Sequence, residues 1–258
     1  MPRGAAWADA RRDSVTRLDV MWQNAELVQR FVDEVRGGVP YGADQLAIMS
    51  RVVAGGRRPV RRLLDLGCGS GVVAQALLAD HAGAEAVLVD FSEPMLARAR
   101  VALAGVAPAP QFATADLADP AWIRCLPNDA SFDVVASSYA IHHLSDARKR
   151  SLYGEILELL TPGGCFVNVE HVASATPAGE ALFEALAIDT LVAFQRRQGS
   201  TKTRDAIAEE FVQRPDKAAN ILAPVETQCA WLRALGYAEV DCFFKVFELA
   251  VFGGRRPL

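Results

Sequence analysis

From about Arg62 onward, short apolar runs alternate with helical segments along the chain. This alternation is typical of βαβ units, in which helices connect parallel strands. Several runs are nearly continuous Val, Leu and Ile, as expected for strands that are covered on both faces. The candidate strands are Arg62–Leu66, Ala86–Asp90, Gln111–Ala115, Phe132–Ser137 and Cys165–Glu170. The pattern therefore predicts an α/β fold with a mostly parallel sheet.

The segments between these strands carry helix start and stop signals. Ser92 is placed to cap a helix that has Pro94 in its first turn and runs toward Leu103. Ser145 or Asp146 begins a second helix, which ends near Leu160. The residues after it, Thr161–Gly164, are expected to form a turn.

The two ends of the chain depart from the alternation. The segments predicted to be helical there are Ala25–Arg36, Gly42–Val53, the inserted pair within Ser174–Ala223, and Pro224–Leu235. Two strand-like runs, Ala238–Phe244 and Phe247–Phe252, then follow each other closely. Strands joined so tightly must be antiparallel. We therefore expect seven strands, with an antiparallel hairpin at the end of the sheet and a helical lid inserted before it.

Length and composition exclude several classes of protein. A chain of 258 residues suits one domain with a lid better than two independent domains. A net charge of -4 and a single dense arginine run, within 57–62, argue against a nucleic-acid partner. Five cysteines without a C-x-x-C pair indicate neither a disulfide framework nor a metal site. No apolar run is long enough for a membrane span and no signal peptide is visible, so we expect a cytoplasmic protein without a membrane partner. The sequence allows a homodimer.

The strongest signal for a ligand is the segment Leu63–Gly71, which reads Leu-Leu-Asp-Leu-Gly-Cys-Gly-Ser-Gly. Its glycines allow a tight turn and a close approach of ligand to backbone, and the helix that follows points its amide groups at that ligand. The spacing differs from the dinucleotide fingerprint, because Val72 occupies the position of the third glycine. Asp65 would repel a pyrophosphate but could hold the cationic amino-acid end of another cofactor.

Acidic residues follow the next two predicted strands. Asp90 lies about 20 positions after the glycine turn, where a carboxylate can accept hydrogen bonds from two ribose hydroxyls. The alternative for Asp90 is that it only caps the helix after Ser92. Asp116 follows the third predicted strand, and the alternative there is that Asp116 and Asp119 are helix caps.

These features together resemble the class I S-adenosylmethionine-dependent methyltransferases. The resemblance covers roughly Arg62–Glu170 and is carried by the Asp65-x-Gly67-x-Gly69-x-Gly71 turn, Asp90, Asp116, Phe132–Val135 and Leu160–Gly164. More loosely, Val39–Tyr41, Ile141–Leu144 and the segment from Trp231 to Gly254 are similar to a bacterial small-molecule branch of that family. The resemblance implies a Rossmann-like sheet, S-adenosylmethionine as the cofactor and a small-molecule acceptor. It also implies one domain in four parts: an N-terminal helical cap (1–56), a cofactor-binding core (57–172), a helical lid (173–223), and a terminal helix and hairpin (224–258).

The resemblance also assigns cofactor contacts to individual residues. It places Gly67 and Gly69 against the methionine portion, Asp65 near its ammonium group, Asp90 on the ribose, Phe91 beside the adenine, Asp116 and Leu117 at the adenine amino group, and Ser137 at the sulfonium end. Cys68, between the two glycines, is also expected to contact the cofactor. Tyr41 either closes over the cofactor or packs against Trp22.

Proton-transferring groups are expected on the same edge of the sheet, where ligands sit in open α/β sheets. His142 and His143 follow the fourth strand, and Glu170 and His171 end the fifth. Any of them could serve as a base if the acceptor keeps a proton. The alternative is structural: a histidine pair that packs the loop, and a strand-end pair that satisfies itself.

The function predicted from these residues is methyl transfer to a small molecule by in-line displacement. One alternative is a protein that uses a modified S-adenosylmethionine for other chemistry or for regulation. A weaker alternative is an NAD-dependent oxidoreductase, against which Val72 argues.

Overall fold

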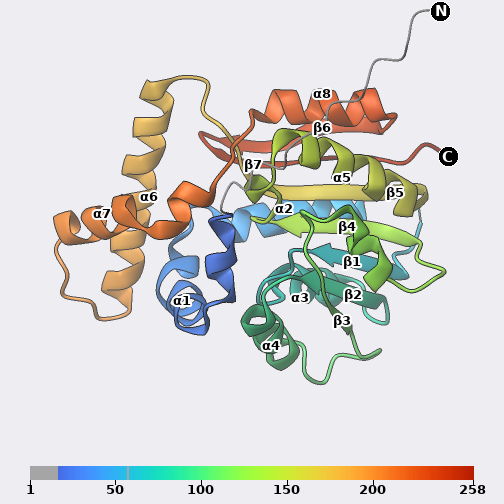
Figure 1. The fold of residues 1–258 in the computed structure, drawn as a ribbon, viewed down its shortest axis with the longest axis horizontal. Helices are drawn as coiled ribbons and strands as arrows, with labels where there is room; N and C mark the ends of the chain where they lie inside the picture. The colour runs from blue at the N-terminus through green and yellow to red at the C-terminus, as the bar shows by residue number, and fades with distance from the viewer. Residues whose placement is uncertain (1–16, 57) are drawn as a thin grey trace, which may run out of the picture.

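A twisted sheet forms the centre of the computed structural model, which describes residues 17–56 and 58–258. Within these residues the sheet has seven strands, in the order β3-β2-β1-β4-β5-β7-β6 (Figure 1). The strands are β1 (Arg62–Leu66), β2 (Glu85–Asp90), β3 (Gln111–Thr114), β4 (Phe132–Ser138), β5 (Leu160–His171), β6 (Ala238–Val246) and β7 (Leu249–Arg255). Strands β1 to β5 are parallel, and β7 pairs antiparallel with both β5 and β6. The predicted α/β fold with its terminal hairpin is confirmed.

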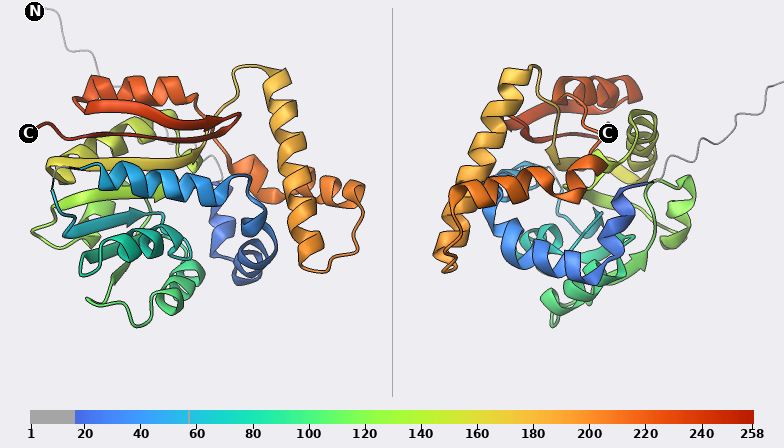
Figure 2. Two further views of the ribbon diagram at one scale, coloured as in Figure 1. Left: turned by 180° about the vertical axis from the view of Figure 1, so that it is seen from behind. Right: turned by 60° about the vertical axis from the view of Figure 1, so that its left-hand side comes forward.

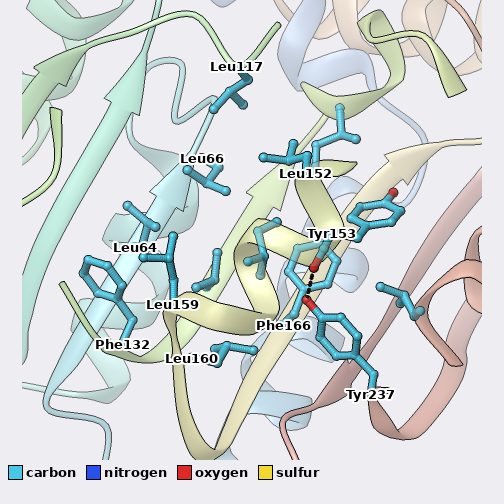
Figure 3. Close-up of a cluster of buried hydrophobic side chains, with 14 of the residues drawn as sticks. Leu64, Leu66, Leu117, Phe132, Leu152, Tyr153, Leu159, Leu160, Phe166 and Tyr237 are labelled. Atoms are coloured by element: carbon cyan, nitrogen blue, oxygen red, sulfur yellow. Dashed lines mark hydrogen bonds between the residues drawn. The ribbon is translucent and has the colours of Figure 1, made fainter. Parts of the chain in front are cut away.

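Helices cover both faces of this sheet, as the apolar strands require. One face packs against α2 (Gly42–Ala54), α3 (Val72–Asp80) and α4 (Glu93–Ala102). The other packs against α5 (Asp146–Leu159) and α8 (Val225–Leu235). Figure 3 shows the second core, where Phe132, Tyr153 and Phe166 are fully buried and the Tyr237 hydroxyl donates to the Tyr153 carbonyl.

The helices between the parallel strands begin at the caps that the sequence predicts. The Ser92 hydroxyl oxygen accepts from the Met95 amide at 3.3 Å and caps α4. Ser145, rather than Asp146, caps α5, because its hydroxyl oxygen accepts from the Arg148 amide. These local hydrogen bonds replace the partners that the first turn of a helix lacks.

Two local predictions were wrong. Thr161–Gly164 belongs to strand β5 instead of forming a turn, because the C-terminal segment pairs with it: the Gly163 amide donates to the Arg256 carbonyl, and the Arg256 amide to the Gly164 carbonyl. The segment Ala25–Arg36 is not one helix. It divides into α1 (Ala25–Arg30), the π-helical turn η2 (Phe31–Val35) and the start of the 3-10 turn η3 (Arg36–Gly38).

The inserted residues form a lid of helices beside the sheet. The lid consists of α6 (Pro177–Arg197), α7 (Arg204–Gln213) and the 3-10 turn η6 (Pro215–Ala219). Figures 1 and 2 show the long helix α6 beside the N-terminal segment, and α6 contacts η3 there. The lid has a core of its own, in which Ile188, Leu191 and Val192 of α6 pack on Ile207 of α7. None of the helices in the described residues is long and apolar enough to cross a membrane.

Candidate active site

A mostly apolar cavity of about 540 Å³ lies at the carboxyl ends of the parallel strands. The glycine turn after β1 and the ends of β2 to β5 form its floor, and the lid and the N-terminal segment cover it. The predicted site residues that line this cavity are Gly67, Gly69, Asp90, Phe91, Leu117, His142, His143 and His171. The predicted site residues outside its lining are Tyr41, Asp65, Cys68, Asp116, Ser137 and Glu170.

The glycine turn is built so that no side chain fits at its first position. Gly67 has a φ of 63°, and a Cβ placed on it would lie 2.2 Å from the Cβ of Ala140. The Cys68 amide donates to the Val89 carbonyl and fastens the turn to β2. The Cys68 side chain is buried in the core beneath the turn, where burial raises the pKa of its thiol. The cavity therefore meets bare backbone at this point.

Asp90 connects the glycine turn to the end of β2. One carboxylate oxygen accepts from the Gly69 amide and the other from the Ser92 amide, each at 2.8 Å. Burial raises the pKa of Asp90. Because a carboxylate has about four lone-pair sites, these two bonds leave capacity for ligand hydroxyl groups. The two predicted roles, support of the turn and binding of a ribose, are therefore compatible.

Asp65 lies directly behind the turn and is fully buried. Its Oδ2 accepts from the Ala74 amide at 3.1 Å, but its Oδ1 is buried without a partner among the described residues. Burial raises the pKa of Asp65 to about 7. A buried carboxylate oxygen without a partner is costly, and a cationic group bound at the turn would compensate for it. This arrangement fits the ammonium group of the expected cofactor.

Phe91 and Leu117, which the resemblance assigns to the adenine, both line the cavity. Asp116 stands beside it: one carboxylate oxygen accepts from the Ala118 amide at 2.9 Å, and the other pairs with Arg17. The Arg17 guanidinium lies 5.8 Å from the centre of the Phe91 ring. Asp119 is a cap, since it accepts from the Ala121 amide.

Two predicted cofactor contacts are not where the sequence suggested. Ser137 is fully buried and its hydroxyl donates to the Leu66 carbonyl, whereas the next residue, Ser138, lines the cavity. Successive side chains of a strand point to opposite faces, which explains the displacement by one residue. Tyr41 is 46% exposed and its ring lies against Phe244, so it reaches neither the cavity nor Trp22.

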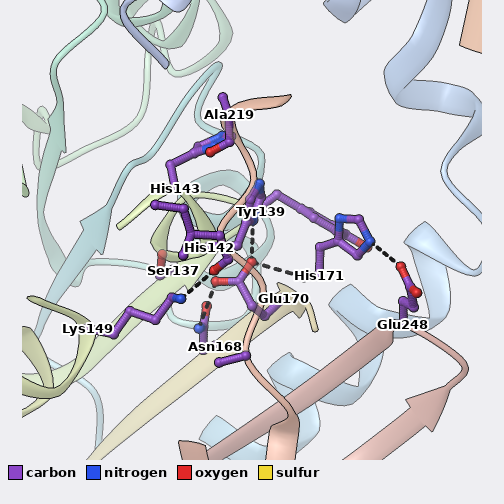
Figure 4. A network of polar contacts seen from close by, with 12 residues as sticks. Ser137, Tyr139, His142, His143, Lys149, Asn168, Glu170, His171, Ala219 and Glu248 are labelled. Carbon is purple, nitrogen blue, oxygen red and sulfur yellow. Dashed lines mark hydrogen bonds and ion pairs between the residues drawn. The ribbon is translucent and has the colours of Figure 1, made fainter. Parts of the chain in front are cut away.

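Glu170 is the centre of a buried polar network behind the cavity wall (Figure 4). Its Oε1 lies 2.6 Å from Nδ1 of His142 and accepts from the His171 amide, and its Oε2 accepts from the Asn168 side chain. These donors favour the carboxylate form of Glu170, in which His142 carries its proton on Nδ1. Burial raises the pKa of Glu170 to about 7 and lowers that of His142 well below its ordinary value. No described group binds Nε2 of His142, and the ring lines the cavity.

The two other histidines at the cavity are also held by one nitrogen each. Nδ1 of His143 donates to the Ala219 carbonyl at 3.2 Å, and burial lowers the pKa of His143 to about 4. Nε2 of His171 pairs with Glu248 at 2.7 Å, so the partner of the His171 imidazole is Glu248 and not the neighbouring Glu170. The ring centre of His142 lies 4.1 Å from that of His143 and 5.8 Å from that of His171. Each imidazole thus has a structural contact and a face toward the cavity.

Two arginines that the sequence did not single out also line the cavity. Arg36, in η3, donates to the Ser70 hydroxyl oxygen at 3.2 Å. Arg214, after α7, lies 4.3 Å from the centre of the Phe211 ring and 3.3 Å from the carboxylate of Asp216. Neither arginine belongs to a motif, and an isolated arginine is most often solvated. Within the described residues, no group of three or more His, Cys, Asp and Glu side chains is placed to hold a metal ion.

Comparisons with known proteins agree with this architecture. Residues 63–164 match the family described as "Methyltransferase domain". The chain is 28% identical over 242 residues to the carboxy-S-adenosyl-L-methionine synthase of Aeromonas hydrophila, covering 91% of this chain and 90% of that one. It is 26% identical over 231 residues to the synthase of Pseudomonas entomophila, covering 88% and 89%.

Solved structures show the same fold at low sequence identity. An O-methyltransferase family protein from Burkholderia thailandensis superposes with a TM-score of 0.58 at 18% identity, covering 88% of this chain and 62% of that one. Human N-acetylserotonin methyltransferase in complex with SAM gives a TM-score of 0.59 at 14% identity, covering 95% and 60%. The chain therefore spans less than two thirds of these two proteins.

Proposed function

Because the chain belongs to the class I S-adenosylmethionine-dependent methyltransferases and is an enzyme that uses S-adenosylmethionine, we propose that it methylates a small, partly apolar acceptor. The acceptor lies in the lid-covered part of the cavity, against His142, His143 and His171. Its reacting group is a hydroxyl or an amine that gives up a proton. The observation that carries the proposal is Nε2 of His142, which lies on the wall of this cavity without a hydrogen-bond partner among residues 17–56 and 58–258.

The cofactor-binding residues in this proposal are those at the carboxyl ends of β1 to β3. Gly67 and Gly69 receive the methionine portion, Asp90 accepts from the ribose hydroxyls, and Phe91 and Leu117 enclose the adenine. Asp116 accepts from the adenine amino group once its contact with Arg17 is exchanged or shared. When bound, the cofactor supplies a methyl group on a positively charged sulfur that needs no covalent activation by the protein.

His142 acts as the general base. Its Nδ1–H donates to the Glu170 carboxylate, so Nε2 carries the lone pair that accepts the proton of the acceptor. Burial keeps the free imidazole neutral, because it lowers the pKa of His142. Once protonated, the imidazolium is stabilised by the same carboxylate. Glu170 is therefore a positioning residue, since it acts through His142 from behind the cavity wall.

The apolar lining makes the second contribution, by orientation and exclusion of water. Phe183, Leu191 and Phe211 of the lid face the same cavity as the three histidines. An acceptor enclosed between them is held in one orientation, and well-oriented reactants gain effective concentrations on the order of 10⁵–10⁸ M. The lining suits an aromatic or aliphatic body with one polar group.

The proposal is tested with S-adenosylmethionine that carries an isotopically labelled methyl group. The purified enzyme is incubated with a panel of small phenols, hydroxy acids and amines, and products are detected by mass spectrometry. We expect label in at least one acceptor, and labelling that is slower by about 10²–10⁴-fold with His142→Gln. Label that never leaves the cofactor, across the whole panel, contradicts the proposal.

A second candidate function follows from the names of the relatives, which are carboxy-S-adenosyl-L-methionine synthases. In this candidate function the chain forms a carboxylated S-adenosylmethionine instead of transferring the methyl group. A cation in the cavity would hold the added carboxylate, and Arg214 lines the cavity on the lid side. Native mass spectrometry of the purified protein separates the two candidates. A co-purified cofactor that is heavier by one carboxyl group supports the second, and unmodified cofactor supports the first.

We also propose a reducing compartment, the cytoplasm, because all five cysteines lack a disulfide partner. The four-part organisation into cap, core, lid and terminal hairpin remains our proposal as well. In it, the cap and the lid together cover the core.

A further inference from the structure

Arg36 is a partly buried cation that lines the cavity beside the glycine turn. Its Nη1 donates to the Ser70 hydroxyl oxygen at 3.2 Å, and a Cβ placed on Gly69 would lie 3.7 Å from the same Nη1. The guanidinium therefore rests directly against the glycine turn. No carboxylate among the described residues lies within ion-pair distance of it. Burial lowers the pKa of Arg36, and the nearby Asp65 opposes this effect.

A guanidinium has five N–H donors, so one bond to a hydroxyl leaves most of them unused. Burying such a group without an anion is costly. Asp65, which precedes the same turn, has a buried carboxylate oxygen, Oδ1, without a partner among the described residues. Among the described residues, the glycine turn therefore has near it a cation without a carboxylate partner and a carboxylate oxygen without a donor. Together these two groups complement an amino-acid zwitterion.

We propose that Arg36 binds the α-carboxylate of the methionine portion of S-adenosylmethionine, while Asp65 compensates the ammonium group of the same portion. An arginine can bind a carboxylate through two parallel hydrogen bonds, which sets orientation as well as affinity. Ser70 positions the guanidinium for this contact. The inference rests on the use of S-adenosylmethionine, but not on the identity of the acceptor.

The lid helix α6 determines where Arg36 lies. A Cβ placed on Gly38 would lie 2.8 Å from Cδ1 and 3.2 Å from Cα of Leu191, and one on Gly37 would lie 2.3 Å from Cε2 of Phe194. The turn η3 approaches the backbone of α6 this closely because both positions lack a side chain. Leu191 also lines the cavity. The helix that covers the acceptor is therefore in direct contact with the turn that carries the carboxylate-binding arginine.

The test compares two ligands that differ by the amino-acid portion, S-adenosylhomocysteine and 5′-methylthioadenosine. Their dissociation constants are measured by calorimetry for the wild type, Arg36→Met and Arg36→Lys. We expect Arg36→Met to weaken S-adenosylhomocysteine at least about 10-fold, as the loss of hydrogen bonds between charged groups implies, and to leave 5′-methylthioadenosine unchanged. Arg36→Lys retains the charge without the bidentate geometry and gives an intermediate loss.

A second variant tests the connection to the lid. Gly38→Ala forces η3 and α6 apart by a few tenths of an ångström, and we expect it to weaken S-adenosylhomocysteine more than 5′-methylthioadenosine, with a smaller effect than Arg36→Met. The matched control is Gly154→Ala, where the new Cβ meets only Leu235 at 3.6 Å on a distant helix. Circular dichroism confirms that each variant is folded.

The outcomes separate this inference from the proposed methylation. Equal weakening of both ligands by Arg36→Met, or no weakening of either, overturns the inference, as does a wild type that binds neither. A wild type that shows the expected ligand pattern but methylates no acceptor refutes the proposed function and leaves the role of Arg36 standing.

Discussion

The buried carboxyl of Asp65 should make the stability of the protein depend on pH. Its folded pKa is about 7, against an ordinary value of 3.8, because its carboxyl is fully buried. A carboxyl whose pKa is raised by folding holds its proton more tightly in the folded state. Its contribution to stability is therefore present below pH 4 and is lost as the pH rises through 7. A difference of about 3 pKa units corresponds to at most ~4 kcal/mol.

Asp65→Asn removes this charge and keeps an oxygen that accepts from the Ala74 amide. Above pH 7 the cofactor-free variant should therefore be more stable than the wild type. Near pH 4.5 the wild-type carboxyl is protonated and carries no charge. The variant should then be the less stable of the two, because its buried Asn amide lacks an acceptor, which costs about 1–3 kcal/mol. Urea unfolding followed by circular dichroism, from pH 4.5 to 8.5, measures this difference. Asp119→Asn, at the cap of the 3-10 turn η4 (Pro120–Cys125), is the control.

A stability difference between wild type and Asp65→Asn that does not change with pH would refute the reasoning. It would mean that the carboxyl is compensated in the folded protein by something other than a bound cation. Saturating S-adenosylhomocysteine should stabilise the wild type more than the variant, because only the wild type offers a carboxylate to the ammonium group.

Three further predictions concern the base, the ribose contact and the core. His142→Gln should keep its affinity for S-adenosylhomocysteine and lose about 10²–10⁴-fold in turnover. In the wild type, the rate of methyl transfer should decline as the pH falls below about 7, because Glu170 becomes protonated there. Steady-state kinetics across pH check both points, and Glu170→Gln should abolish that decline. Asp90→Asn should weaken S-adenosylhomocysteine and 5′-methylthioadenosine alike, by at least about 10-fold; calorimetry that finds only the first weakened would contradict the ribose assignment. Tyr153→Phe should lower the free energy of unfolding by about 1–2 kcal/mol, because the Gln228 side-chain oxygen loses a buried donor, and unchanged urea unfolding would argue against that.

The parallel strands and their helices were predictable because their signals are local. Apolar runs and the Ser92 and Ser145 caps each act within a few residues. The extension of β5 through Thr161–Gly164 was not predictable in this way, since it depends on pairing with Arg256. Local propensity gives way where distant segments pair.

The sequence predicted the edge of the sheet on which the candidate site lies, but not the orientation of every side chain there. The carboxyl ends of parallel strands meet at one edge, so the glycine turn, Asp90 and His142 had to lie near one another. The sequence could not tell that Glu170 lies behind the wall while His142 faces the cavity. It also missed Arg36, because the position of that side chain depends on contact between η3 and the distant helix α6.

The central claim is that one cavity places a sulfonium methyl group before the free nitrogen of His142. A crystal structure with S-adenosylhomocysteine tests it most directly. We expect the adenine between Phe91 and Leu117, the ribose hydroxyls on Asp90, and the sulfur facing His142. A nucleoside bound elsewhere, or with its sulfur directed away from the three histidines, would contradict the account.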